Sequence, residues 1–155
     1  MTQISNLGTR LRHLIDLLDQ GVDSAYFAAG LEYRARFTPA VRVLLTIKRP
    51  SIRRIAMEAG ITHSAASQTV AQMERFGLIR FEDGADKRER LVVATDQLHA
   101  MIPQLKEVWA ATAQGARLLD KELGVNLQAV VEKAIDCLVE RSFADRISKV
   151  VKCRL

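Results

Sequence analysis

Apolar residues recur at steps of three and four near the start of the chain. Within residues 5–31 this spacing predicts a helix with one apolar stripe and a charged opposite face. Gly21 lies inside the pattern, and because glycine weakens a helix by about 1 kcal/mol relative to alanine, the pattern leaves room for a kink there. The stripe consists of Leu7, Leu11, Leu14, Ile15, Leu18 and Val22.

Two short helices are predicted next, each with a clear start signal. In FTPAVRVLLTI, residues 37–47, Thr38 can cap the helix and Pro39 suits its first position, where no backbone N–H is needed. Pro50 stops this helix. Ser51 can then cap IRRIAMEA, which Gly60 ends in the left-handed conformation that favours glycine.

A third short helix is predicted to begin after Thr62 and to end at Gly77. Its two faces differ sharply in chemistry. The inner face comprises Ala66, Val70 and Met73 with Phe76 near the end, and the outer face comprises Ser64, Ser67, Gln68, Ala71 and Gln72.

Alternating residues then predict a β-hairpin. LIRFE, residues 78–82, and RLVVA, residues 90–94, alternate as paired strands do, and DGADKRE between them is rich in turn-forming residues. The tip of this ribbon is basic.

The rest of the chain predicts two longer helices. Thr95 can cap the first, Pro103 should bend it, and Gly124 ends it, after which Asn126 can cap the second. The second helix is the last one predicted, and it carries a broad apolar stripe of Leu127, Val130, Val131, Ala134, Ile135, Leu138 and Val139.

These elements predict a mainly α-helical protein with a winged helix-turn-helix, in which two short helices precede a basic hairpin. This hairpin, residues 78–94, is called the wing. The 155 residues fit one domain, with the winged part at 36–95 and flanking helices at 1–35 and 96–155. So small a winged core cannot cover both flanking stripes, which favours a homodimer held by these helices. The residues expected at its interface are Leu7, Leu11, Leu14, Val131 and Leu138.

The distribution of charged residues indicates what kind of partner the protein binds. The formal net charge is +5, and residues 48–90 hold nine basic against six acidic residues, most of the excess. A moderate basic surplus placed on the winged segment favours double-stranded DNA, although many basic proteins bind no polyanion.

The outer face of the third short helix is suited to the major groove. Small side chains allow close approach to the bases, and hydroxyl and amide groups can exchange hydrogen bonds with base edges. A helix N-terminus also offers N–H groups to a phosphate. The alternative is an ordinary solvated face. The residues proposed to contact DNA here are Thr62, His63, Ser64, Ser67, Gln68 and Gln72.

Two groups of basic residues could add contacts to the DNA backbone. Arg53 and Arg54 lie at a helix N-terminus, where positive charge is mildly unfavourable. This placement weakly favours a phosphate partner for the two arginines. The alternative, that they are solvated beside Glu58, has equal support. Lys87, Arg88 and Arg90 lie on the hairpin; their alternative role is to keep a turn solvated.

With these features, the sequence resembles the MarR family of bacterial transcription regulators. The resemblance rests on GITHSAASQTVAQMERFGLIR running toward DKRERLVVAT, where Asp, any residue and Arg precede an aliphatic strand. It implies a homodimeric repressor on a pseudo-palindromic operator, released by a small ligand or an oxidant. It also implies that Arg88 enters the minor groove and that Asp86 holds the wing in shape.

Other classes of function find less support. The chain shows no nucleophile–base pair, phosphate loop or metal-ligand spacing, so an enzyme, a cofactor and a metal are not expected. Cys137 and Cys153 lack ligand spacing, and Cys137 is expected to be a small buried hydrophobe. No signal or membrane-spanning segment is expected, which favours the cytoplasm.

Two readings stay open beside the main one. Tyr33 and Trp109 are candidates for a small-molecule effector pocket, although an aromatic residue on an apolar helix is more often core. A winged helix can also serve only protein contacts, with no specific DNA partner.

Overall fold

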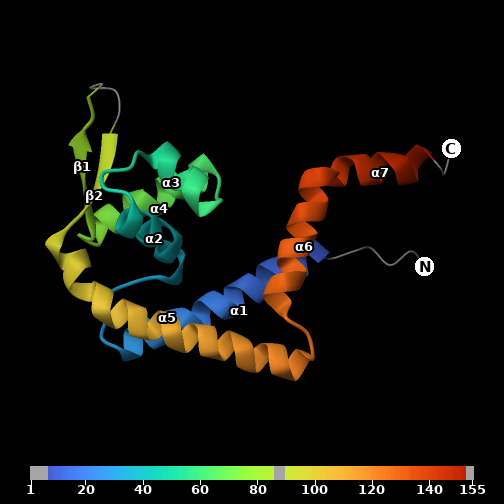
Figure 1. The fold of residues 1–155 in the computed structure, drawn as a ribbon, viewed down its shortest axis with the longest axis horizontal. Helices are drawn as coiled ribbons and strands as arrows, with labels where there is room; N and C mark the ends of the chain where they lie inside the picture. The colour runs from blue at the N-terminus through green and yellow to red at the C-terminus, as the bar shows by residue number, and fades with distance from the viewer. Residues whose placement is uncertain (1–6, 86–89, 153–155) are drawn as a thin grey trace. The chain divides into compact units, whose positions relative to one another are not determined.

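The computed structural model describes residues 7–85 and 90–152 (Figure 1). The chain forms two compact units, Met1–Ala110 and Ala111–Leu155. The mainly helical winged fold predicted from the sequence is confirmed. The division into a winged part and flanking dimerisation helices stays a prediction.

The first unit contains four α-helices, one 3₁₀-helix, two strands and the beginning of a fifth α-helix among the described residues. Helix α1 runs unbroken through Gly21, and α5 runs through Pro103. The elements are α1 (Leu7–Ala28), η1 (Ala35–Phe37), α2 (Thr38–Thr46), α3 (Ile52–Ala59), α4 (His63–Arg75), β1 (Ile79–Asp83), β2 (Arg90–Ala94) and α5 (Asp96–Leu123).

The predicted cap at Thr38 is wrong. The 3₁₀-helix η1 runs directly into α2, so Phe37 takes the cap position without a side-chain hydrogen bond and Thr38 is already helical. The Thr38 hydroxyl is therefore free for tertiary contacts. It lies 3.2 Å from the Tyr26 hydroxyl and accepts a hydrogen bond from the Tyr33 hydroxyl at 3.4 Å.

The turn between α3 and α4 forms as predicted. The Ser51 hydroxyl accepts a hydrogen bond from the Arg54 N–H at 3.2 Å, which caps α3. Gly60 ends that helix with φ of 66°, a conformation that glycine adopts without steric cost. Thr62 then caps α4 by accepting a hydrogen bond from the Ala65 N–H at 3.1 Å.

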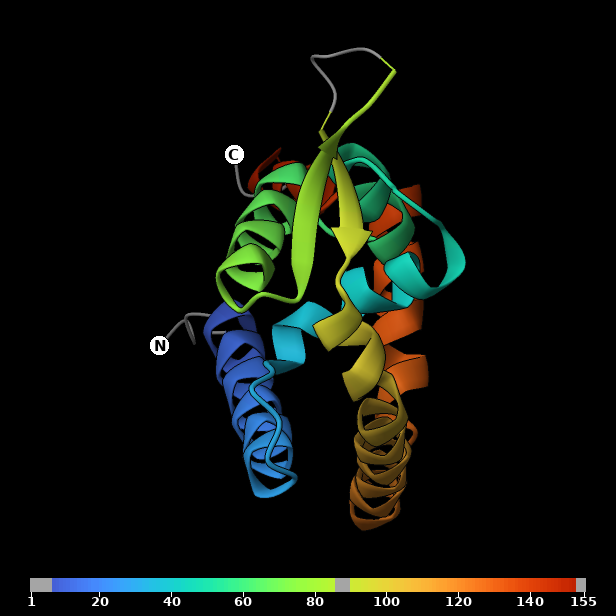
Figure 2. The same ribbon diagram turned by 90° about the vertical axis from the view of Figure 1, so that its left-hand side faces the viewer.

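Strands β1 and β2 pair antiparallel, with Ile79 opposite Ala94 and Asp83 opposite Arg90. Figure 2 shows the hairpin beside α4, with which β1 is in contact. The segment before α3 adds a short third edge, because the Val92 N–H donates to the Pro50 carbonyl at 2.8 Å. The sequence pattern did not predict this edge.

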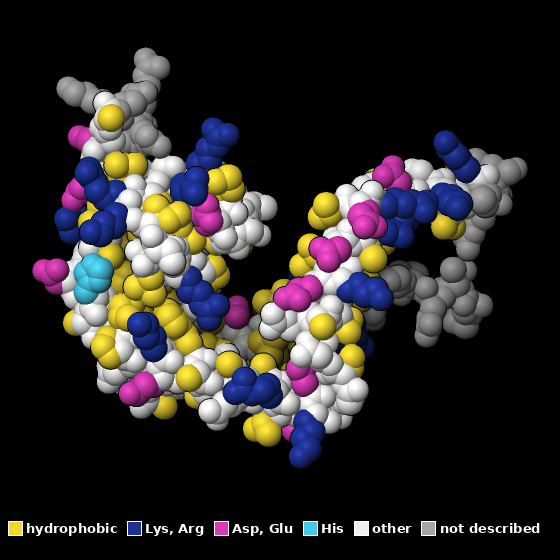
Figure 3. Space-filling view, viewed as in Figure 1, with side chains coloured by type: hydrophobic (Ala, Val, Ile, Leu, Met, Phe, Trp, Pro, Cys, Tyr) yellow, Lys and Arg dark blue, Asp and Glu magenta, His cyan; other side chains and the backbone are white. Residues whose placement is uncertain are grey.

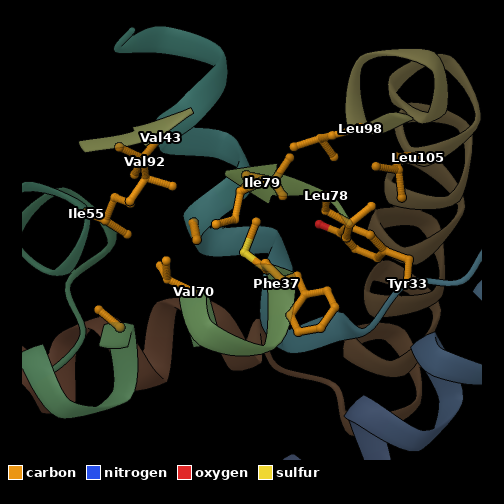
Figure 4. Packing of buried hydrophobic residues seen from close by; sticks show 14 of the residues in the cluster. Tyr33, Phe37, Val43, Ile55, Val70, Leu78, Ile79, Val92, Leu98 and Leu105 are labelled. Carbon is orange, nitrogen blue, oxygen red and sulfur yellow. The ribbon is translucent and has the colours of Figure 1, made fainter. Parts of the chain in front are cut away.

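A continuous apolar core joins the elements of the first unit. Figure 4 shows Tyr33 and Phe37 together, with Leu78 close by and Leu98 and Leu105 of α5 on the same side. Aromatic rings connect α1 to the end of α4: Tyr26, Tyr33, Phe37 and Phe76 form a chain of edge-to-face contacts. This core supports the inner face of α4.

The second unit contains the end of α5, then α6 (Leu127–Glu140) and α7 (Phe143–Lys152). Asn126 caps α6 as predicted, accepting a hydrogen bond from the Ala129 N–H at 2.7 Å. Helix α7 was not predicted. Its start is set by Ser142, whose hydroxyl accepts from the Asp145 N–H at 3.1 Å and donates to the Asp145 carboxylate at 2.6 Å.

Helices α6 and α7 bury none of their described residues within this single chain. The expectation that Cys137 is buried is therefore wrong for the chain by itself, because this residue is exposed along with the α6 stripe. Figure 3 shows hydrophobic side chains exposed along α6 among acidic ones. Within the described ranges, no helix has the length and apolar character needed to cross a membrane.

Candidate nucleic-acid interface

Helix α4 presents small and polar side chains on its outer face. Thr62, His63, Ser64 and Gln68 are exposed, whereas Ser67 and Gln72 are half-buried at the edges of that face. On the inner side, Ala66, Val70 and Met73 are fully buried as predicted, and Thr69 is buried with them. The structure therefore brings the proposed α4 contacts onto one surface, and the core fixes the rotation of that surface.

The Thr62 cap allows a direct test of how α4 is anchored. Thr62→Ala is expected to lower the free energy of unfolding by about 1 kcal/mol, because the Ala65 N–H loses its hydrogen-bond acceptor. Urea titration measures the change, with the neighbouring exposed Ser64→Ala as the control. Equal stabilities of the two variants would contradict a stabilising cap.

The hairpin carries the next set of proposed contacts. Arg90 is exposed, and its guanidinium lies 3.9 Å from the centre of the Phe81 ring, close enough for a cation–π contact. Figure 3 shows basic and acidic side chains intermixed over the two strands. Asp86, Lys87 and Arg88 lie outside the described residues.

The two arginines of α3 differ in their surroundings. Arg53 is exposed, whereas Arg54 forms an ion pair of 2.7 Å with Glu58, one turn further along the helix. The Glu58 carboxylate thus balances part of the positive charge at this helix start.

Tyr33 and Trp109 both belong to the core region of the first unit. Tyr33 is buried, and that burial raises the pKa of its hydroxyl far above its usual value, so it stays neutral. The indole N–H of half-buried Trp109 donates to the Tyr26 hydroxyl at 2.9 Å, and the Arg42 guanidinium lies 5.4 Å from its ring centre. Tyr33 also lines a cavity of about 450 Å³ with Phe27, Arg34, Arg75 and Phe76. Their role in ligand binding stays a prediction.

No group of three or more metal-ligating side chains lies together in the part of the chain that the structure describes. His63 is exposed at the start of α4.

Comparison with protein-family models and with curated protein sequences finds no match. Solved structures do match. The PcaV transcriptional regulator from Streptomyces coelicolor, in complex with its natural ligand, is 20% identical with a TM-score of 0.64, over 91% of this chain and 94% of that one. Sco3205, a MarR family transcriptional regulator from the same organism in complex with DNA, is 22% identical with a TM-score of 0.58, over 85% and 92%. This chain has the MarR-type fold.

A third solved structure that matches is that of CouR from Rhodococcus jostii RHA1, bound to p-coumaroyl-CoA. It is 20% identical with a TM-score of 0.56, over 92% of this chain and 96% of that one. These matches cover about nine tenths of this chain and are therefore not limited to the winged segment.

Within this MarR-type fold, sequence reasoning missed one polar cluster beside the wing. Arg49 and Arg80 both pair with Glu82, at 3.1 and 2.7 Å. Two features of the sequence point to charged residues here: an arginine directly before Pro50, and a strand with charges of both signs. Neither feature shows that Arg49 pairs with Glu82, because the two residues are far apart along the chain.

Proposed function

We propose that this protein is a member of the MarR family that binds double-stranded DNA and regulates transcription, as a repressor, in the bacterial cytoplasm. The observation that carries the proposal is the exposed face of α4, small and polar, next to a hairpin with basic side chains. The residues assigned to DNA contact are Arg53, Arg54, Thr62, His63, Ser64, Ser67, Gln68, Gln72, Lys87, Arg88 and Arg90, with Asp86 shaping the wing.

The operator is proposed to be pseudo-palindromic because the protein is proposed to be a homodimer. Two symmetric copies place two α4 helices in successive major grooves, about 34 Å apart along the DNA. The exposed apolar side chains of α1 and α6 support self-association, since faces of this kind mark interaction sites. Leu7, Leu11, Leu14, Val131 and Leu138 are assigned to that contact.

A small-molecule effector is proposed to release the operator. Two of the similar structures hold a ligand: PcaV is in complex with its natural ligand, and CouR is bound to p-coumaroyl-CoA. In this chain the candidates are Tyr33, which lines a cavity, and Trp109, whose ring lies beside Arg42. An effector that weakens DNA binding must itself be bound more weakly by the DNA complex, because coupling between two sites is reciprocal.

Selection from a random duplex library at near-physiological salt tests the function directly. The expected result is an enriched inverted repeat, with half-sites about one helical turn apart and two chains in the sedimenting complex. Weak binding without an enriched sequence, lost at moderate salt, would overturn it. The winged helix would then be better explained as a module for protein contacts.

Arg88→Ala tests the wing assignment. We expect operator binding to weaken by about 1–3 kcal/mol and the salt dependence to flatten, because each phosphate contact contributes about −0.9 to the slope. Fluorescence anisotropy at several salt concentrations measures both. Arg10→Ala removes the same charge from exposed α1 and serves as the control. Equal affinities and slopes for the two variants would remove Arg88 from the interface.

A further inference from the structure

The loop between α2 and α3 has an unusual backbone at Arg49. Among the residues that the structure describes, Arg49 is the one residue other than glycine with a positive φ, at 56°. This left-handed conformation is uncommon for a residue with a side chain, and such residues persist where surrounding contacts hold them. The contacts of Arg49 are therefore informative.

Those contacts go to the first strand of the wing. The Arg49 Nε lies 3.1 Å from the Glu82 Oε2, and its Nη2 donates to the Asp83 carbonyl at 3.5 Å. The other oxygen of the same carboxylate, Oε1, accepts from the Arg80 Nη2 at 2.7 Å. One carboxylate thus links two cations, and Arg49 connects the loop to β1.

The same loop also holds the second strand. The Val92 N–H donates to the Pro50 carbonyl at 2.8 Å, and Ser51 forms an isolated β-bridge with Leu91. Loop residues 49–51 therefore contact both strands of the hairpin.

This contact lies where the hairpin leaves the core. Ile79 and Val92 are buried near its base, whereas Asp83 and Arg90, the last pair before the tip, are exposed. Beyond the buried residues, the Arg49–Glu82 ion pair and the Asp83 contact add to the Ser51–Leu91 bridge in holding the hairpin to the loop. Without them, this part of the hairpin is held only by its pairing with β2 and by the Ser51–Leu91 bridge, so its direction is less tightly constrained.

We propose that Arg49 is a positioning residue that sets the direction of the wing through Glu82, and that this direction contributes to the choice of DNA sequence. The proposal rests on the proposed DNA-binding function. The role is assigned through the carboxylate because the Arg49 Nε faces Glu82 and its Nη2 faces the Asp83 carbonyl. Glu82 is the second positioning residue.

Two variants and one matched control separate positioning from charge. Arg49→Gly removes the side chain without strain, since glycine accepts a positive φ. Glu82→Gln keeps the shape of the side chain and removes its charge, with no change in the loop backbone. The control is Glu58→Gln, which also removes one carboxylate charge. Glu58 forms an ion pair of 2.7 Å with Arg54 inside α3, outside the hairpin.

The first readout is the ratio of operator affinity to scrambled-duplex affinity. We expect this ratio to fall about threefold in both Arg49→Gly and Glu82→Gln, the scale of one exposed ion pair, and to stay unchanged in Glu58→Gln. A direct phosphate contact by Arg49 gives a different pattern. Arg49→Gly would then weaken both duplexes equally, Glu82→Gln would strengthen both, and the unchanged ratio would overturn the proposal.

The second readout needs no DNA. Hydrogen exchange of the Val92 amide in the free protein is expected to speed up in Arg49→Gly and in Glu82→Gln, but not in Glu58→Gln. Unchanged exchange in Glu82→Gln would overturn the positioning role even if an operator is found. If no operator is found, the proposed function fails by itself, and faster exchange still supports the control of the wing by Arg49 and Glu82.

Discussion

Leu138→Glu is expected to dissociate the proposed homodimer into monomers that bind the proposed operator only weakly. In the single chain, Leu138 is 45% exposed on α6, in one stripe with Val131 at 42% and Ile135 at 54%. Burial of such a stripe by a second copy removes apolar surface from water, which is the main driving force for association. In a two-fold interface each substitution occurs twice, so two carboxylates enter the apolar contact together.

The loss of operator affinity should be large because the two half-sites are then bound independently. Linking two binding modules raises the overall affinity by about 10²–10⁴ over that of one module, and dissociation of the dimer removes this gain. Sedimentation measures the association state, and anisotropy measures binding to the full inverted repeat and to a single half-site. The half-site affinity of the variant should stay near that of the parent chain.

Ala129→Glu is the matched control, since it adds the same side chain to α6. Ala129 is exposed on the first turn of the helix, nine residues before Leu138 and therefore on the opposite face. A carboxylate there is favourable, because the helix N-terminus carries partial positive charge. A Leu138→Glu protein that is folded and dimeric would refute the proposed interface, and dissociation of both variants would point to a general effect of charge.

The sequence predicts most of this fold because its helix boundaries are local. Ser51, Thr62 and Asn126 each cap a helix through an N–H three residues away, so the signal and its partner lie within one turn. Hairpin pairing is also local, because alternation and the turn composition together define which residues can face each other. The polar face of α4 follows from the same periodicity.

Predictions failed where the deciding partner was distant in sequence. Thr38 has every feature of a cap, but a preceding 3₁₀-helix and two tyrosines 5 and 12 residues away give it a different role. Arg49 and Glu82 meet through the fold alone. Helix α7 is a different case, since Ser142 and Asp145 form a local capping pair that sequence reasoning passed over.

Periodicity identifies an apolar face but not what covers it. The stripe of α6 led to the expectation that Cys137 is buried, yet this face is exposed in the single chain. On the inner face of α4, Ala66, Val70 and Met73 have the same spacing and are fully buried within the first unit. The physical difference is the presence of a neighbouring layer from the same chain, which spacing alone does not encode.

Phe37→Ala is expected to lower the free energy of unfolding by about 3–5 kcal/mol, the range for removing a large aromatic from a core. Phe37 is fully buried, and its ring centre lies 5.6 Å from that of Tyr33 and 5.3 Å from that of Phe76. The substitution removes the ring that connects the loop after α1 to the end of α4. A change of this size is a large part of the roughly 5–15 kcal/mol that keeps a domain folded.

Phe27→Ala provides the comparison, because Phe27 is 85% exposed at the end of α1 and should cost less than about 0.5 kcal/mol. Urea unfolding of both variants at one protein concentration gives the difference, since the stability of a dimer depends on concentration. Similar stabilities would show that the aromatic chain is not a structural support. If the difference is as expected, binding to the proposed operator by Phe37→Ala should weaken even where the protein stays folded. Phe76 ends α4, the helix proposed to contact DNA, and would lose its packing partner.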